Sequence, residues 1–410
     1  MKKTLWTKNY TCITLATILS AIGGEAMVLP VSLLVFEKTQ STLLSAVIMV
    51  CGILPDIVFS VLMAPIIDRG RKKHWIMGMD FVIVLVYLLV GIWVRYSEFQ
   101  YGMYVGMTLV VGTASVFYKL AYHALYPDLI PVGFEQKGYA ISGTIYPLII
   151  IIMSPVVTFL YENVSMSNIF FFVAGITVGS IIIESRITET VKTECAENSG
   201  YTFQQYRADV QEGFAYLKRE KGIRNIYTYM AVTNGTSEGS ALAIQAFYQS
   251  QPGMTVMMLG FLKSAEMLGR VLSGIVQYRI EVPPKKRFGV TKFVYTFYQL
   301  SDMVLLFLPY PFMLLNRFAC GGLGTMSATL RETAVQSYLP VNIRARVNAV
   351  FQLFFAIGSI AFQFLSGVLG EFLPYRALVV LEAGVSMLVM WIFIVRPGNE
   401  NRKVYEAVRE

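Results

Sequence analysis

Long apolar runs separated by short polar stretches make up most of this chain. A helix needs about 20 apolar residues to cross a hydrocarbon layer roughly 30 Å thick, and lipid offers no partner for backbone N–H and C=O groups. The pattern therefore predicts twelve membrane-spanning helices. The twelve runs cover residues 11–36, 42–67, 75–94, 99–118, 138–160, 168–187, 226–247, 255–277, 289–308, 312–331, 347–369 and 375–395.

The composition agrees with an integral membrane protein. Hydrophobic residues make up 55% of the 410 positions, charged residues 15%, and the mean hydropathy is +0.56. A large soluble protein carries about a quarter charged residues on average. The first run exceeds the 7–15 apolar residues or so of a signal-peptide core, so we expect it to be a retained span.

The Lys and Arg residues indicate the orientation of the spans. With the N-terminus inside the cell, 28 of the 34 basic residues fall on the cytoplasmic side, and only Lys38, Arg95 and Arg376 fall in outer loops. Because basic loops stay in the cytoplasm, both termini are predicted to be cytoplasmic. The net charge of +8 then reflects topology and contact with anionic lipid, and we expect no nucleic-acid partner.

The chain divides into two halves of six spans. We expect an N-terminal six-helix bundle over residues 1–190, a linker with an amphipathic helix over 191–224, a C-terminal six-helix bundle over 225–396, and a cytoplasmic tail over 397–410. The stretches "LIPVGFEQKGYA" (129–140) and "YLPVNIRARVNA" (338–349) share Pro, Val and Ala at a constant offset, each after the fourth span of its half. A parallel repeat of this kind is typical of transporters.

Ionisable residues inside the apolar runs are candidates for substrate or proton binding, because a charge in hydrocarbon is costly and rare. Glu25 and Glu238 lie near the middle of equivalent spans, with glycines nearby and no basic residue within one turn. Burial favours the protonated form of a carboxyl group, so we expect both residues to bind a proton or a cation. The alternative is a carboxylate that only hydrogen-bonds a neighbouring helix.

Five further residues complete the candidate binding set. Asp56 follows Pro55, and the trio of the eighth span can share one helix face, either as a binding site or as a self-neutralising ion-pair cluster. The five are Asp56, Lys263, Glu266, Arg270 and Arg317. Asp302 and Glu382 also lie in or near spans but are not used as candidates.

The turn after the second span reads "APIIDRGRKKHW" and resembles the signature loop of the major facilitator superfamily, with Ala64 where that family has a leading glycine and with a loop one residue shorter. The segments "LYPDLIP", "SPVVTFLY" and "VQEGFAYLKREKGIRNI" are similar to the macrolide-efflux branch. The resemblance implies a gating motif. Its residues here are Asp68, Arg69, Gly70, Arg71 and Lys72. The alternative for its charged members, Asp68 included, is topogenic charge alone.

The resemblance implies a secondary active transporter that works by alternating access. We expect proton-coupled export of lipophilic or cationic compounds of the drug or macrolide type, from a bacterial plasma membrane. A lipid or lysolipid flippase and a metabolite symporter stay open, as does a non-transporting receptor or scaffold. We expect no enzyme activity, no metal and no cofactor beyond the proton motive force, and a monomer whose partners are small lipophilic substrates, protons and membrane lipids.

Overall fold

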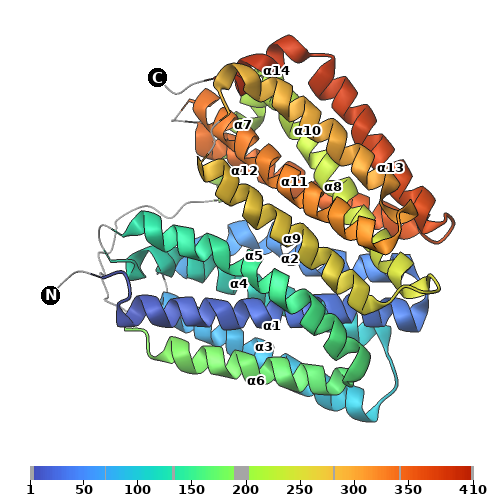
Figure 1. Ribbon diagram of the computed structural model, residues 1–410. Coiled ribbons are helices and arrows are strands. Elements are labelled where there is room, and N and C mark those ends of the chain that lie inside the picture. Colours follow the sequence, from blue (N-terminus) through green and yellow to red (C-terminus); the bar gives the residue numbers. More distant parts are fainter. Residues whose placement is uncertain are drawn as a thin grey trace. The chain divides into compact units, whose positions relative to one another are not determined.

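The computed structural model describes residues 4–69, 71–131, 134–188, 203–279, 282–340 and 343–407. Over these ranges the regular structure is entirely helical, with no β-strand (Figure 1). Contacts divide the chain into two compact units, Met1–Lys38 with Ile48–Phe203 and Thr39–Val47 with Gln204–Glu410. Each of the twelve apolar runs lies largely on one helix, and some helices extend well past their run, α4 by eleven residues and α11 by seven.

The first unit is built from the six helices that follow the first six runs. Several of them continue past the apolar run onto polar residues, because a helix that leaves hydrocarbon keeps its backbone hydrogen bonds. The helices are α1 (Lys8–Thr39), α2 (Thr42–Arg69), α3 (Lys72–Tyr96), α4 (Tyr101–Leu129), α5 (Glu135–Asn163) and α6 (Met166–Ser185).

The second unit contains the remaining helices and the first residues of α2. They are α7 (Phe203–Arg219), α8 (Lys221–Ser250), α9 (Val256–Arg279), α10 (Pro284–Val304) with a 3₁₀ turn (Leu305–Phe307), α11 (Tyr310–Tyr338), α12 (Arg344–Leu369), α13 (Tyr375–Met390) with a π-turn (Trp391–Val395), and α14 (Gly398–Tyr405). Residues 397–410, which we expected to form a tail, thus include the short helix α14. Its Asn401 is buried and donates hydrogen bonds to the Phe393 and Ile394 carbonyls.

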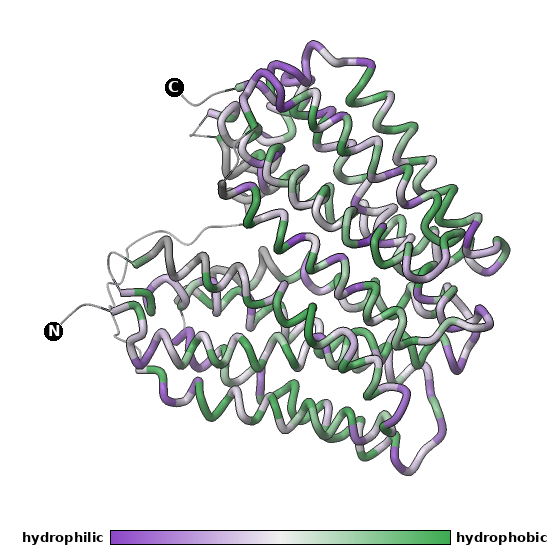
Figure 2. Tube along the Cα trace, viewed as in Figure 1, coloured by the Kyte–Doolittle hydropathy of each residue, from purple (hydrophilic) through white to green (hydrophobic). Residues whose placement is uncertain are grey.

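Eight of the described helices have the length and apolarity to cross a membrane, which makes this a multi-pass membrane protein. They are α1 to α6, α12, and α13 with its π-turn. Hydrophobic positions dominate these helices, and hydrophilic positions are most frequent at helix ends and connections (Figure 2). Helices α8 to α11 are long enough but more polar.

Small residues allow neighbouring helices to approach closely within each unit. In the first unit, α3 packs on α6 at Gly91, where a Cβ would lie 3.1 Å from the Cβ of Phe170. In the second unit, α8 packs on α12, where a Cβ on Gly235 would overlap the Gly358 carbonyl oxygen. These contacts hold the helices that carry the ionisable residues described below.

The end of α6 is capped by a side chain of α3. Lys73 Nζ donates hydrogen bonds to the carbonyl oxygens of Ser185 (2.6 Å) and Ile187 (2.7 Å). The last carbonyls of a helix have no partner inside it, and a basic side chain there also complements the helix dipole.

We expect Lys73→Met to lower the free energy of unfolding by about 1 kcal/mol, since a charge-assisted bond is lost at a partly exposed place. Thermal unfolding of the purified protein in detergent, followed by circular dichroism, measures this. The control is Lys38→Met, because Lys38 contacts Glu37 at 3.5 Å with both side chains about half exposed. Equal unfolding temperatures for the two variants would contradict the capping role.

The start of α2 is held by a carboxylate of the second unit. Glu371, in the connection between α12 and α13, accepts hydrogen bonds from the Ser41 hydroxyl (2.6 Å), the Thr42 hydroxyl (3.3 Å) and the Leu43 N–H (2.9 Å). Partial burial raises the pKa of Glu371, but the donated hydrogen bonds outweigh it and the pKa is lowered. The carboxylate therefore stays ionised and caps the N-terminus of this helix.

Candidate functional site

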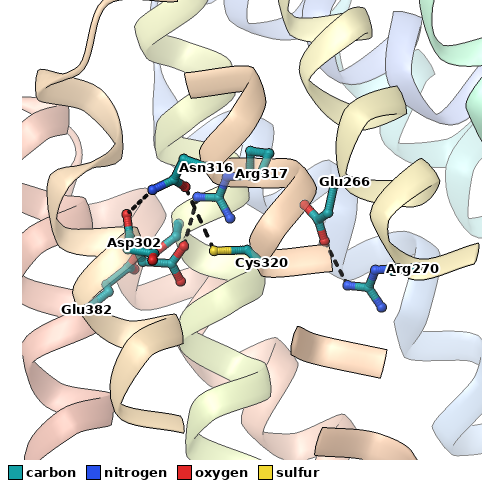
Figure 3. Close-up of polar contacts among 9 residues, drawn as sticks. Glu266, Arg270, Asp302, Asn316, Arg317, Cys320 and Glu382 are labelled. Carbon is teal, nitrogen blue, oxygen red and sulfur yellow. Dashed lines mark hydrogen bonds and ion pairs between the residues drawn. The ribbon is translucent and has the colours of Figure 1, made fainter. Parts of the chain in front are cut away.

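The most deeply buried ion pair among the described residues joins α10 and α11 in the second unit (Figure 3). Arg317 Nη2 lies 2.9 Å from Asp302 Oδ1, and both side chains are 8% exposed. The 3₁₀ turn Leu305–Phe307 and Pro309 connect the two helices tightly. Asp302 near the end of α10 therefore lies beside Arg317, two turns into α11.

Polar groups of α11 and α10 surround this pair. Asn316 Nδ2 donates to the Ser301 carbonyl (3.0 Å), and the Cys320 thiol contacts Asn316 Oδ1 at 3.8 Å. These contacts orient the first turns of α11, so they hold the Arg317 guanidinium against α10.

A third carboxyl group, Glu382 of α13, lies next to the ion pair in Figure 3. It is 4% exposed and accepts hydrogen bonds from the Ser240 hydroxyl (2.6 Å) and the Ser366 hydroxyl. A Cβ on Gly239 would overlap both the Glu382 carboxyl and Ser366 Oγ. The glycine of α8 is therefore what lets Glu382 fit between α8 and α12.

Part of the hydrogen-bonding capacity of the ion pair is unused. Arg317 Nη2 and Asp302 Oδ1 are partners in the ion pair, but Arg317 Nε is buried with no hydrogen-bond partner in the described part of the chain. A buried guanidinium with free N–H groups can bind the oxygen of a polar ligand.

A second ion pair joins two residues of α9 that are one helical turn apart. Arg270 Nη2 is 2.7 Å from Glu266 Oε1, with side-chain exposures of 42% and 20%. Here α9 crosses α11 very closely: a Cβ on Gly269 would overlap the Phe318 carbonyl oxygen, and a Cβ on Gly321 would overlap the Glu266 carbonyl oxygen. The backbones of α9 and α11 are therefore in contact at this crossing, which separates the Glu266–Arg270 pair on α9 from Arg317 on α11.

Two other candidates lie on α8 and α9. Glu238 is exposed and accepts a hydrogen bond from Gln363 Nε2 of α12 (3.3 Å). Lys263 of α9 is half-buried. The structure thus places Glu238 at an accessible face of α8, two residues before Ser240, which binds Glu382.

In the first unit, the two candidate acids have different surroundings. Glu25 lies on α1 and is half-buried. Asp56 of α2 forms an ion pair with Lys119 of α4 at 3.1 Å, with side-chain exposures of 42% and 58%. Asp56 therefore has a cationic partner that the sequence did not indicate.

The predicted gating motif is only partly described. Asp68 and Arg69 end α2, but their side chains lie outside the described part, as does the whole of Gly70. Arg71 is exposed and precedes the first residue of α3. The predicted gating contacts of Asp68 thus stay a prediction.

Lys72, the last member of the motif, binds the end of α4. Its ammonium group donates to the Ala124 carbonyl (2.9 Å) and lies 3.4 Å from Asp128 Oδ2. Besides any topogenic effect, Lys72 therefore connects α3 to α4 inside the first unit.

Four buried acids are absent from the candidate set that the sequence suggested. Asp302 and Glu382 were noticed but not used, because their depth in the spans was not evident. Asp80 and Glu184 were missed, although each is a carboxylate within or at the end of an apolar run. That signal, applied to every such residue, would have found all four.

Comparisons with known proteins place these observations in a family. The family model described as Major Facilitator Superfamily matches residues 13–294. Two Streptococcus pyogenes sequences named macrolide efflux protein A, one from serotype M6, are each 21% identical over 218 residues. The match covers 53% of this chain and 53% of each relative, so the chain spans about half the length of the curated relatives it matches.

Solved structures of transporters have a similar fold. The nucleoside transporter NupG has a TM-score of 0.70 at 11% identity, with 95% of this chain and 99% of that chain covered. The peptide transporter POT has a TM-score of 0.68 at 11% identity (98% and 97%). A bacterial homologue of the human lysosomal transporter Spinster has a TM-score of 0.63 at 12% identity (98% of each chain). At these identities the likeness shows the fold alone.

Proposed function

The chain belongs to the major facilitator superfamily, and from that premise we propose that it is a secondary active transporter that exports lipophilic or cationic compounds in exchange for protons. The observation that carries the proposal is the set of charged side chains on helices of membrane-spanning length, above all the buried Arg317–Asp302 pair with the unpartnered Arg317 Nε. Such groups are costly in a membrane and mark substrate or ion sites. The names of the curated relatives support export of a macrolide-like compound.

We further propose twelve membrane spans with both termini in the cytoplasm of a bacterial cell. Helices α8 to α11, which are more polar than the other eight, would supply the remaining four spans. Their charged residues pair with one another, as in Glu266–Arg270 and Arg317–Asp302. Pairing lowers the cost of placing charge at membrane depth.

Within this proposal, residues of both units have distinct roles. Glu25 and Glu238, each on the first helix of its half, take up and release protons. The charged residues of α9 and α11 orient the substrate. The loop from Asp68 to Lys72 acts as a gate at the cytoplasmic side, supported by the contacts of Lys72 with α4. Alternating access then requires no soluble cofactor, only the proton motive force.

The test is the retention of a panel of fluorescent lipophilic compounds in cells. Cells with the wild-type protein are expected to retain less of at least one compound than cells with an empty vector, and a protonophore should abolish the difference. Glu25→Gln should abolish it as well, because an amide cannot release a proton. Glu98→Gln, which changes an exposed carboxylate of the same unit, is the control.

If cells with the wild-type protein and cells with the empty vector retain every compound equally, the proposal of drug export is wrong. In that case a lipid flippase or a metabolite symporter takes its place. If export persists in the presence of the protonophore, the proposal of proton coupling is wrong.

A further inference from the structure

Two further carboxyl groups are buried in the first unit. Asp80 of α3 is 4% exposed and Glu184 of α6 is fully buried. Asp80 lies eight residues, or about 12 Å, along α3 from its first residue. The Lys73 contact places the end of α6 beside the start of α3, and side chains tilt toward the N-terminus of their helix. Glu184 therefore points inward, toward Asp80.

Hydroxyl groups from three helices surround these carboxyl groups. Glu184 Oε1 accepts hydrogen bonds from Tyr118 of α4 and Ser180 of α6, both at 3.3 Å. Ser20 of α1 lies 3.3 Å from the Tyr118 hydroxyl and 3.4 Å from the Ser180 hydroxyl. Ser180 also faces Asp80. A hydroxyl has a single proton to donate, so Ser180 cannot satisfy both acids at once.

Each carboxyl group has one oxygen without a donor in the described part of the unit. Asp80 Oδ2 and Glu184 Oε2 are each buried without a hydrogen-bond partner among the residues that the structure describes. Two ionised carboxylates would leave both acceptor oxygens unpaired and two like charges in a dry place. One added proton would supply a donor, and it would also remove the repulsion.

No cation forms an ion pair with either carboxyl group among the residues that the structure describes. The titratable groups that face the pair within the described part of the unit are tyrosines: Tyr87 on α3, Tyr118 on α4 and Tyr146 on α5. No Lys, Arg or His lies within ion-pair distance of Asp80 or Glu184 there. This distinguishes the pair from Asp56, which contacts Lys119.

We propose that Asp80 and Glu184, with the hydroxyl groups of Ser20, Tyr118 and Ser180, form a monovalent-cation site that holds one proton shared by the two carboxyl groups. Uptake adds H⁺ to one carboxylate oxygen and release returns it, with no other bond formed or broken. A sodium ion offers the same charge to the same oxygens. The role of this site in coupling rests on the proposed function; its occupation by a cation does not.

The experiment is infrared spectroscopy of the purified full-length protein in lipid vesicles. A protonated carboxyl group has a C=O stretching band apart from the carboxylate and amide bands. In choline chloride near neutral pH, the spectrum of the wild type minus that of Asp80→Asn/Glu184→Gln should show the band of one carboxyl group. The control is the spectrum of the wild type minus that of Glu98→Gln, which changes an exposed carboxylate. This control difference spectrum should show no band of a protonated carboxyl group.

Further arms identify the occupant and guard against a misfolded double variant. Loss of the band in sodium chloride assigns sodium as a second occupant, and an unchanged band assigns the proton alone. Tyr118→Phe removes a donor to Glu184 and should shift the band to higher frequency. Absence of the band in the choline difference spectrum, or a band that Tyr118→Phe does not move, would overturn the site.

The two proposals fail separately. If the band is present but no compound is exported, the cation site stands and the proposed function falls. If proton-driven export is observed and the difference spectrum is empty, the reverse holds.

Discussion

Arg317→Met is expected to cause one of the largest losses of stability of any single substitution in this protein. The change leaves the Asp302 side chain, which is 8% exposed, without its cation. Removing one partner of a buried ion pair typically costs about 3–5 kcal/mol, because the remaining charge is uncompensated. Chemical or thermal unfolding of the purified protein in detergent measures the loss, and compound export should fall with it.

A double substitution separates charge from packing. Arg317→Met/Asp302→Leu removes both charges together, and apolar replacement of a buried pair is often neutral in stability. We therefore expect the double variant to recover most of the lost stability but not export. The control Arg402→Met breaks a more exposed pair, in which Nε lies 3.6 Å from Glu406 Oε1, and should cost less than about 1 kcal/mol. Equal losses for Arg317→Met and Arg402→Met would show that the buried pair does not stabilise the fold.

Gly269→Ala is the second substitution with a large expected effect. The new Cβ would overlap the Phe318 carbonyl oxygen on α11, and backbone cannot move aside as the end of a side chain can. Forcing extra volume into a packed interface costs about 1–3 kcal/mol or more. We expect lower thermal stability and weaker export, because the displaced crossing carries the Glu266–Arg270 pair and lies beside Arg317.

The same helix offers a matched control. A Cβ on Gly274, also on α9, would meet nothing within 4 Å. Alanine favours a helix over glycine by about 0.5–1 kcal/mol, so Gly274→Ala should be neutral or slightly stabilising. If both alanine variants unfold at the wild-type temperature, the close crossing of α9 and α11 does not constrain the protein.

Helix positions were predictable because they depend on local sequence. A run of apolar residues must form a helix in lipid whatever its neighbours are, and the runs at 11–36 and 75–94 lie inside α1 and α3. The helix ends were less predictable. Helix α11, for example, continues seven residues beyond its run to Tyr338, because hydropathy does not report where backbone hydrogen bonding stops.

The partners of the ionisable residues could not be predicted, because they come from other helices. Glu266 and Arg270, four residues apart, were expected to share a helix face, and the structure pairs them. Arg317 binds an acid of α10 that was set aside for its unknown depth. Asp56 was a candidate because it follows Pro55, and its contact with Lys119, 63 residues away, was not predicted. Spacing along one helix is visible in a sequence, but the rotation of one helix against another is not.

The capping of α2 by Glu371 means that this protein cannot be divided into two autonomous fragments by a single cut between its halves. The donors that Glu371 requires, Ser41, Thr42 and Leu43, are encoded in the first half, and Thr39–Val47 belongs to the second compact unit. A fragment that begins at residue 203 would lack the segment that completes its own unit. The two fragments, produced separately, should therefore be less stable apart than together, and co-production should restore them by complementation.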